Sequence, residues 1–369
     1  MKATKKLTLL DRIFLWINYG LCLALFISYL APVTDPRKVW LVAFFGLAYP
    51  PLLLVNCVLI LYWALRKRWY FLLSLITIFC GYGVLCKNIG FHFGNGSITL
   101  PSQNIRLMTY NVHNFKKFGF SKDISTKHEI LQVIEQQHPD IIGFQEFYTR
   151  KKGQYDMADS IKKMMQTENC YIKAFDANND EIIGMAIFSK YPIINQGLIF
   201  LSTEVGDGTQ CLYVDVKKDD RPFRIYSVHL QSIQFDPKDY KLVTAASKIG
   251  QTDIHSVLRM GGKLKKAFLK RADQVFKIKA HAAQCPYPYI ISGDFNDTPT
   301  SFAVNQMAKG LKNAFVEKGL GLGRTYNGDF PNYQIDYIMA NRQFDVLSYA
   351  IVEKKLSDHY PVVSDLVLR

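Results

Sequence analysis

The sequence lacks any cysteine pattern that would build a disulfide framework or a zinc site. Its seven cysteines form no CxxC pair and show no metal-ligand spacing. Four of them, Cys22, Cys57, Cys80 and Cys86, lie in apolar surroundings and are interpreted as small hydrophobic side chains. Neither a disulfide framework nor a zinc site is therefore expected.

Acidic residues are almost absent from the N-terminal part of the chain. Residues 1–103 hold two Asp/Glu against ten Lys/Arg, whereas the rest of the chain holds 29 against 35. Of the formal net charge of +14, +8 thus belongs to the apolar N-terminal part and +6 to the larger remainder. Basic residues beside apolar segments are typical of membrane-flanking loops. The charge therefore gives little support to a nucleic-acid-binding protein.

Three long apolar runs, at residues 13–31, 39–65 and 69–86, contain no charged residue. Each is about as long as the roughly 20 residues that a helix needs to cross a bilayer. Residues 1–90 are therefore predicted to form a membrane anchor of three transmembrane helices, with Pro50-Pro51 kinking the second near its centre. A cleaved signal peptide is the alternative for the first run, but its length and the two later runs favour an anchor.

The basic flanks predict the orientation of these helices. Lys2, Lys5, Lys6 and Arg12 precede the first run, and Arg66–Arg68 separates the second from the third. The positive-inside rule places both flanks in the cytoplasm, so a multi-pass protein of the cytoplasmic membrane would hold the polar part outside. If the third run were re-entrant, the polar part would return to the cytoplasm. Residues 91–103 are predicted to be a short linker.

Residues 104–369 mix hairpins with strand–helix units. Strands are expected near residues 105–110, 141–144, 184–190, 210–216, 223–228, 290–293, 335–339 and 362–368, with helices near 125–137, 156–165 and 263–284. This order predicts an α/β fold, a four-layer sandwich with two mixed sheets face to face and helices outside. Residues 232–262 have no place in that scheme. They are interpreted as a surface excursion with a short helix or as a lid beside a functional site.

Polar residues follow several apolar strands at the point where each strand ends. The clearest case is Gly293-Asp294-Phe295-Asn296, where a buried strand stops in a polar turn. The full set is Asn111, Glu146, His229, Asp294, Asn296, Asp336, Asp358 and His359. Each alone has an ordinary explanation, as a turn residue, a solvated carboxylate or a buried histidine. Together they supply the groups that phosphoryl transfer requires.

In order and spacing, these motifs resemble the endonuclease/exonuclease/phosphatase superfamily, which includes DNase I-like nucleases, inositol polyphosphate 5-phosphatases and neutral sphingomyelinases. The resemblance covers residues 104–369 and is carried by Thr109-Tyr110-Asn111, Gln145-Glu146, Ser227-Val228-His229, Gly293-Asp294-Phe295-Asn296, Ile335-Asp336-Tyr337 and Ser357-Asp358-His359-Tyr360-Pro361. It implies a metal-dependent phosphoesterase.

The resemblance also implies a metal site. Glu146, helped by the side-chain oxygen of Asn111, would hold Mg²⁺, with Mn²⁺ as the alternative, and Asp358 would lie near the metal or its waters. Oxygen ligands of this kind suit Mg²⁺.

The remaining residues are implied to be catalytic. Asp294 would orient and deprotonate the attacking water, and Asn296 would position that water or the phosphate. His229 and His359 would donate hydrogen bonds to the phosphate oxygens. Asp336 would hold His359 in one tautomer.

The substrate stays open between three hypotheses. The first is a membrane-tethered phosphodiesterase acting on a lipid headgroup, similar to neutral sphingomyelinases. The second is a membrane-bound or extracytoplasmic nuclease acting on DNA or RNA. The third is a membrane scaffold without turnover, which the complete residue set disfavours. The partners expected are the lipid bilayer and a phosphodiester, and the sequence gives no basis for naming a protein partner.

Overall fold

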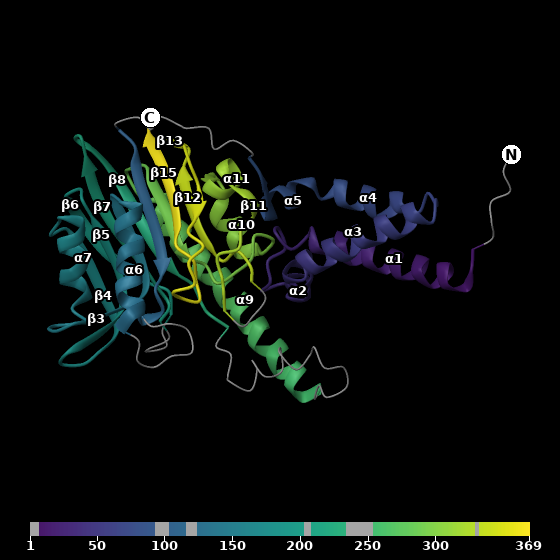
Figure 1. Ribbon diagram of the computed structural model, residues 1–369, viewed down its shortest axis with the longest axis horizontal. Helices are drawn as coiled ribbons and strands as arrows, with labels where there is room; N and C mark the ends of the chain where they lie inside the picture. The colour runs from purple at the N-terminus through teal and green to yellow at the C-terminus, as the bar shows by residue number, and fades with distance from the viewer. Residues whose placement is uncertain (1–6, 93–102, 116–123, 203–207, 234–253, 329–331) are drawn as a thin grey trace.

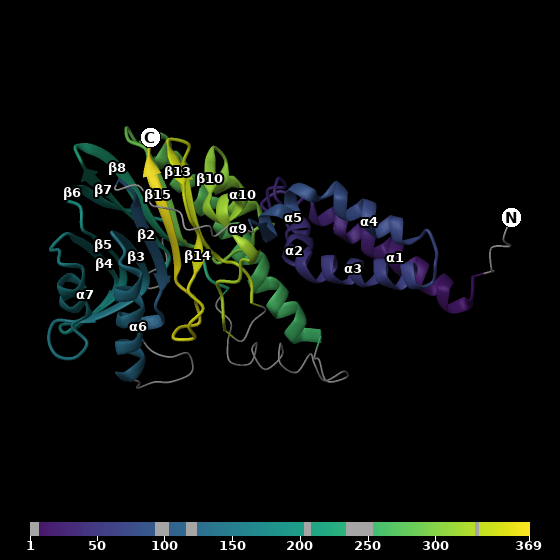
Figure 2. The same ribbon diagram turned by 45° about the horizontal axis from the view of Figure 1, so that its top comes forward.

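The computed structural model describes residues 7–92, 103–115, 124–202, 208–233, 254–328 and 332–369. A layered α/β domain forms one end of the molecule, and a bundle of apolar helices projects from it (Figure 1). A second view, turned by 45°, shows the same separation (Figure 2). The helices of the bundle are α1 (Leu9–Ser28), α2 (Leu41–Leu47), α3 (Tyr49–Leu65), α4 (Phe71–Cys80) and α5 (Tyr82–Asn88).

Two mixed sheets form the α/β domain. In the first, the strand order is β13 (Phe344–Val346), β15 (Val362–Leu368), β2 (Ile105–Asn111), β3 (Ile141–Arg150), β5 (Glu181–Ser189) and β4 (Cys170–Ala177), with β14 (Ala350–Ile351) also pairing with β15. In the second, the order is β10 (Leu311–Asn313), β12 (Asp336–Asn341), β9 (Tyr289–Asp294), β8 (Arg221–His229), β7 (Gln210–Lys218) and β6 (Ile193–Phe200).

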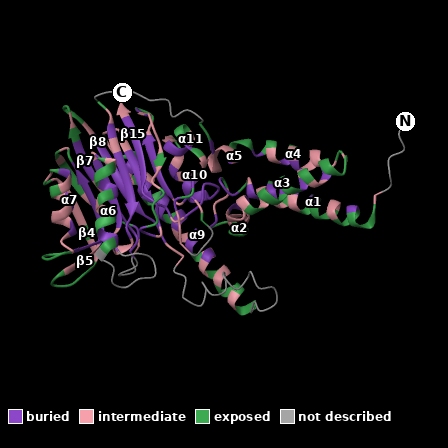
Figure 3. Cartoon of the chain, viewed as in Figure 1, coloured by how far each residue is buried: buried purple, intermediate pink, exposed green. Residues whose placement is uncertain are grey.

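Apolar side chains fill three parallel layers. The central core lies between the two sheets and includes Leu107, Ile225 and Ile290. A second cluster lies under α6 (Ile124–Gln137) and α7 (Met157–Met165), and a third under α9 (Ile254–Ala283) and α10 (Phe302–Ala308). The buried strands therefore stand between two helical layers (Figure 3). The predicted α/β sandwich with two mixed sheets is confirmed.

Strand register brings the predicted polar residues to one edge. β8 and β9 run parallel, so His229 pairs with Asp294, and β12 places Asp336 opposite Asp294 from the other side. Gly293 is required here because its φ is +140° and a Cβ would lie 2.1 Å from the carbonyl oxygen of Val228. The glycine thus lets Asp294 leave the sheet beside His229.

Of the three predicted membrane helices, the first is a single helix and the other two are bent helix pairs. Only α1, among the described residues, is a single helix long and apolar enough to cross a membrane. The second run bends by 60° between α2 and α3, and the third by 75° between α4 and α5, so three spans exist only if each bent pair counts as one. The first bend lies at Ala48 because Pro50 and Pro51 fit the first turn of α3 but not a helix interior.

The bundle docks on the α/β domain through specific contacts. A short strand, β1 (Ile89–Phe91), pairs with β11 (Leu320–Leu322), where the sequence analysis expected a linker to begin. Asn88 donates a hydrogen bond to the Thr300 hydroxyl (3.1 Å), and Lys87 to the Asn305 side chain (2.7 Å). The loop that follows β9 therefore lies against the bundle.

Other elements differ from expectation in extent. The helix expected at 263–284 begins earlier, at Ile254, and continues through Gly261-Gly262. Of the segment 232–262, residues 234–253 lie outside the described residues, as do residues 93–102 of the expected linker. Strands β4 and β6 and helices α10 and α11 (Ala314–Lys318) were not predicted.

Candidate active site

The Asp294 carboxylate lies at the centre of the candidate site. Its side chain is 1% exposed. Asn111 donates to Asp294 Oδ2 (3.2 Å), and the backbone N–H of Asn296 donates to Oδ1 (2.8 Å). The Nε2 atoms of His229 and His359 lie 3.6 and 3.7 Å from Oδ2. Polar groups from β2, from β8 and from the segment before β15 thus meet at one carboxylate.

Both histidines are held by a second hydrogen bond. His229 Nδ1 donates to the carbonyl of Gly208 (3.0 Å), and His359 Nδ1 donates to Asp336 Oδ2 (2.9 Å). These bonds fix the tautomers and leave each Nε2 facing Asp294. The structure therefore shows the expected pairing of Asp336 with His359.

The side chain of Glu146 reaches the region of Asp294 from β3, which is irregular at this position. A bulge interrupts the pairing of β3 with β5 between Phe144 and Phe147, and Glu146 has a positive φ of 50°. Bulges of this kind redirect a side chain. Its Oε1 atom accepts a hydrogen bond from Asn111 (3.3 Å) and lies 4.0 Å from His229 Nε2.

The amide of Asn111 is turned the other way from the expectation. Its Nδ2 atom faces the two carboxylates, and its oxygen accepts the backbone N–H of His113 (3.2 Å). Two acceptor-only carboxylates favour an amide donor between them. In this arrangement Asn111 orients Glu146 and Asp294 with its nitrogen.

The side chain of Asn296 also differs from the expectation. It donates to the carbonyl of Leu230 (3.0 Å) and to Asp294 Oδ2 (3.2 Å). Asn296 has a positive φ of 53°, which an Asn tolerates better than most residues. In this arrangement it holds the Asp294 carboxylate rather than reaching outward.

His113 is a member of the site that the sequence analysis missed. His113, Asn114 and Phe115 form a short turn in which all three have positive φ. His113 Nδ1 lies 3.4 Å from Glu146 Oε2 and 3.8 Å from Asp358 Oδ1. The turn thus joins Asp358 to the group around Glu146. Non-glycine residues in this conformation are strained, and such strain concentrates at functional sites.

The surroundings of Asp294 and Glu146 shift the pKa values of the two carboxyl groups in opposite directions. Burial raises the pKa of Asp294 to about 6, against the opposing effect of His359 and His229. Burial also opposes ionisation of Glu146, but the hydrogen bond from His113 and the nearby His229 outweigh it and lower its pKa to about 2. Carboxylates with divergent pKa values suit a proton acceptor beside a permanent anion.

The residues present fit a divalent cation. Glu146 Oε2 and Asp358 Oδ1, from the two expected carboxylate ligands, lie 3.4 and 3.8 Å from the same atom, His113 Nδ1. Asp294, Asp336 and His359 form a second group, with ligand atoms within 4.8 Å of one another, and Asp336 Oδ1 is buried with no hydrogen-bond partner among the described residues. Glu146 adds a carboxylate that is partly exposed, at 29%. Several carboxylate oxygens around one point are the donor set that Mg²⁺ prefers.

A buried ion pair supports the site from behind. Arg271 of α9, whose side chain is 1% exposed, contacts Asp297 (3.0 Å) and donates to the carbonyl of Gln231 (2.8 Å). It thereby fixes the two chain segments that leave β8 and β9. The sequence did not indicate this ion pair, because Arg271 and Asp297 lie on different elements.

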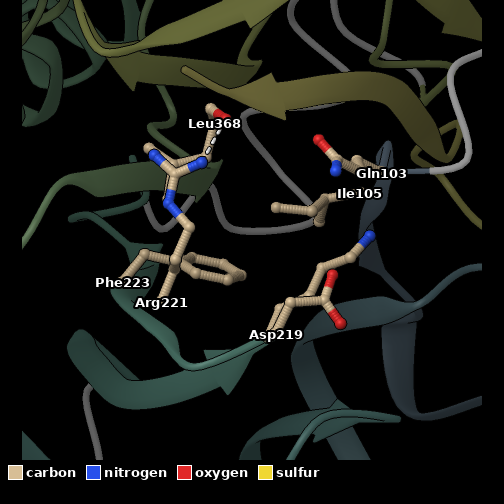
Figure 4. Close-up of a pocket in the computed structure, with 7 residues that line it drawn as sticks. Gln103, Ile105, Asp219, Arg221, Phe223 and Leu368 are labelled. Carbon is tan, nitrogen blue, oxygen red and sulfur yellow. Dashed lines mark hydrogen bonds between the residues drawn. The ribbon is translucent and has the colours of Figure 1, made fainter.

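A small cavity at the other end of the sandwich is unrelated to this site. It has a volume of about 180 Å³ and is lined by Ile105 at the start of β2, Phe223 near the start of β8 and Leu368 at the end of β15 (Figure 4). Arg221 at its edge already donates to the backbone carbonyls of Leu368 and Arg369.

Comparison with known families agrees with the fold and the site. A sheet sandwich with carboxylates and histidines gathered at its strand ends defines a metal-dependent hydrolase of phosphoric esters. The model of the Endonuclease/Exonuclease/phosphatase family matches residues 108–359, and the chain belongs to this family. A domain of unknown function, DUF8431, matches residues 11–88. No curated protein matches the chain.

Solved structures share the fold at low identity. A family member from Bacteroides thetaiotaomicron is 18% identical, with 72% of this chain and 98% of that chain covered and a TM-score of 0.53. A mannosyl-6-phosphatase from the same organism is also 18% identical (72% and 100% covered, TM-score 0.50). The human Nocturnin catalytic domain with bound sulfate is 15% identical (73% and 97%, TM-score 0.50). At these identities the similarity shows the fold alone.

Replacing Arg271 with Met should lower the free energy of unfolding by about 3–5 kcal/mol, because Asp297 would stay buried without its charged partner. Replacing Asp297 with Leu in the same chain should recover most of that loss. Denaturant unfolding of the two variants measures both effects. Equal stability of Arg271→Met and the parent chain would show that the pair does not support these loops.

Proposed function

We propose that the protein is a membrane-anchored, Mg²⁺-dependent phosphodiesterase that acts on the headgroup of a membrane lipid. The observation that carries the proposal is the docking of an apolar helix bundle directly on the loop that follows Asp294 and Asn296. A catalytic centre built against an anchor meets substrates that lie in the bilayer.

The roles of the site residues follow from their contacts. Asp294, with its raised pKa, accepts the proton of the attacking water. His229 and His359 present their Nε2 atoms to the phosphate oxygens, and Asp336 keeps His359 oriented. Asn296 and Asn111 hold Asp294 in place.

Glu146 and Asp358 are the proposed metal ligands. Glu146 would hold the cation, with Asp358 beside it near His113 and with the Asn111 amide orienting the Glu146 carboxylate. When bound, the cation supplies Lewis-acid stabilisation of the charge that develops on the phosphate.

The helix bundle has the polarity of a membrane-embedded structure. Its interior is polar: Asn18 donates to Ser74 (2.7 Å), Ser74 donates to Asn56 (2.8 Å), and Trp63 donates to Asn18 (3.1 Å). Its exterior carries exposed apolar side chains such as Trp16, Leu23, Leu54, Leu61 and Phe79. Water would favour the reverse arrangement, whereas lipid tolerates it. We infer that the bent helix pairs are embedded together with α1.

The N-terminal half of α9 adds a basic surface beside the bundle. Residues 254–270 contain five Lys/Arg and no acidic residue. Lys265 lies 4.5 Å from the Trp40 ring, and Phe268 packs edge-on against Phe44 of α2. Ile254 and Leu258 are exposed. A basic helix with exposed apolar residues suits the interface with anionic lipid.

Replacing Asp294 with Asn should lower Mg²⁺-dependent hydrolysis of a phosphodiester by about 10³-fold, because the proton acceptor is lost while size and burial are kept. Turnover measured with and without a chelator isolates the metal-dependent rate, and Asp159→Asn on α7 serves as the matched control. Turnover within twofold of the parent would refute the role of Asp294.

Replacing Glu146 with Gln should raise the Mg²⁺ concentration that gives half-maximal activity by at least about tenfold, since a charged ligand becomes neutral. The exposed Glu168→Gln change should leave the titration as in the parent. A Glu146→Gln titration that overlays the parent curve would exclude Glu146 as a metal ligand.

The topology prediction is tested with single cysteines in a chain whose native cysteines are replaced. Asp220, 91% exposed in the turn between β7 and β8, and Lys67, exposed between α3 and α4, lie on opposite sides of the membrane under this proposal. A membrane-impermeant maleimide should label Asp220→Cys in spheroplasts and label Lys67→Cys only after lysis. The reverse pattern would place the catalytic domain in the cytoplasm.

A further inference from the structure

An apolar cavity separates the helix bundle from the catalytic loops. Its volume is about 520 Å³, within the range of about 300–1,000 Å³ typical of small-molecule sites. On the bundle side its wall includes Tyr49, Pro50, Leu53, Leu54 and Cys57. On the side of the α/β domain it includes Thr298, Pro299, Arg324 and Gln334. We propose that this cavity binds an acyl chain of a phosphodiester lipid whose headgroup lies in the active site, an inference that rests on the proposed function.

The cavity is continuous with the apolar surface of the bundle. Leu54 on α3 lines it and is 65% exposed, and the next turns of α3 expose Val58 and Leu61. An acyl chain can therefore pass from the outer face of α3 into the cavity without leaving an apolar surface. A water-soluble ligand has no apolar surface to bury against this face of α3.

Three chain segments lead from the cavity to the catalytic residues. Thr298 is two residues from Asn296, Gln334 is two residues from Asp336, and Arg324 is two residues from Tyr326. The Tyr326 ring packs edge-on against His359, with ring centres 5.4 Å apart. Two residues of extended chain span about 7 Å. The cavity is thus adjacent to the proposed phosphate site.

Two residues of the cavity wall, Thr298 and Gln334, also carry buried polar atoms. The hydroxyl of Thr298 and the side-chain oxygen of Gln334 are buried and have no hydrogen-bond partner among the residues described. The Tyr337 hydroxyl lies 2.9 Å from the backbone carbonyl oxygens of both Asp297 and Gln334, so its one hydrogen can be donated to either segment. Buried polar groups without partners are costly. These atoms are not exposed to the cavity, so the acyl-chain proposal rests on the apolar walls of the cavity.

Arg324 completes the match to a lipid. Its exposed side chain lines the cavity, on the segment that leads to Tyr326. A cation at the polar end of an apolar cavity complements the phosphate at the end of an acyl chain.

A cavity-filling substitution tests the proposal in the full-length chain. Leu54→Trp obstructs the cavity, and Leu61→Trp makes the same change on the exposed face of α3 outside it. Leu54→Trp should lower kcat/KM for long-chain sphingomyelin or phosphatidylcholine in mixed micelles at least tenfold. It should leave hydrolysis of bis(p-nitrophenyl) phosphate, which has no acyl chain, unchanged, and Leu61→Trp should change neither. Equal effects of the two substitutions on the lipids would overturn the proposal.

A binding measurement separates this proposal from the proposed function. A lipid with a photoreactive diazirine in its acyl chain should crosslink to residues 49–57 in the parent and in Leu61→Trp, and at least fivefold less in Leu54→Trp. If no lipid is hydrolysed but this pattern holds, the lipid-hydrolase function fails and the acyl-chain site stands. Crosslinking that is unaffected by Leu54→Trp would refute the site even if lipids are hydrolysed.

Discussion

The burial of one carboxylate constrains the whole catalytic edge of the sandwich. Asp294 is almost fully enclosed, and a buried carboxylate is tolerated only where donors surround it. Donors and histidines come from both sheets: Asn111 donates from one, His229 approaches from the other, and His359 approaches from the segment before β15. The strand ends that carry these residues in the two sheets must therefore lie next to each other. A hydrogen bond between Gln145 and Ser227 (3.0 Å) joins them one residue before Glu146 and two before His229.

The loop after β9 couples this edge to the membrane helices. Arg271 holds Asp297 from one side, while Asn88 of α5 contacts Thr300 from the other. A Cβ at Gly46 would meet the Thr300 carbonyl oxygen at 3.3 Å, so α2 also approaches this loop closely. Movement of the bundle relative to the domain would shift the residues that immediately follow Asn296. Anchor and active site therefore share a structural element.

Sequence patterns predicted what depends on local periodicity and turn chemistry. Apolar strands that end in polar residues identified Asp294, His229 and His359, and register brought them together. Sequence did not predict His113, because its role depends on a left-handed turn of three residues, of which Phe115 is a poor former of that conformation. Arg271 was hidden among the other lysines and arginines of α9, where only burial distinguishes it. The kink at Pro50-Pro51 was predicted from the prolines, whereas the bend between α4 and α5 is not encoded in hydropathy.

The position of the apolar cavity bears on how a lipid headgroup would reach a buried carboxylate. Moving a lipid out of the bilayer exposes its chains to water at about 0.8 kcal/mol per CH₂ group. An enzyme whose catalytic site lay far from its membrane anchor would have to overcome this free-energy cost for most CH₂ groups of the acyl chain. Here the cavity opens on α3, and its inner end is two residues from Asn296 and Asp336 along the chain. An acyl chain that moves along apolar surface from the bilayer to the cavity would expose little additional area to water. Only the headgroup would then need to enter the polar site.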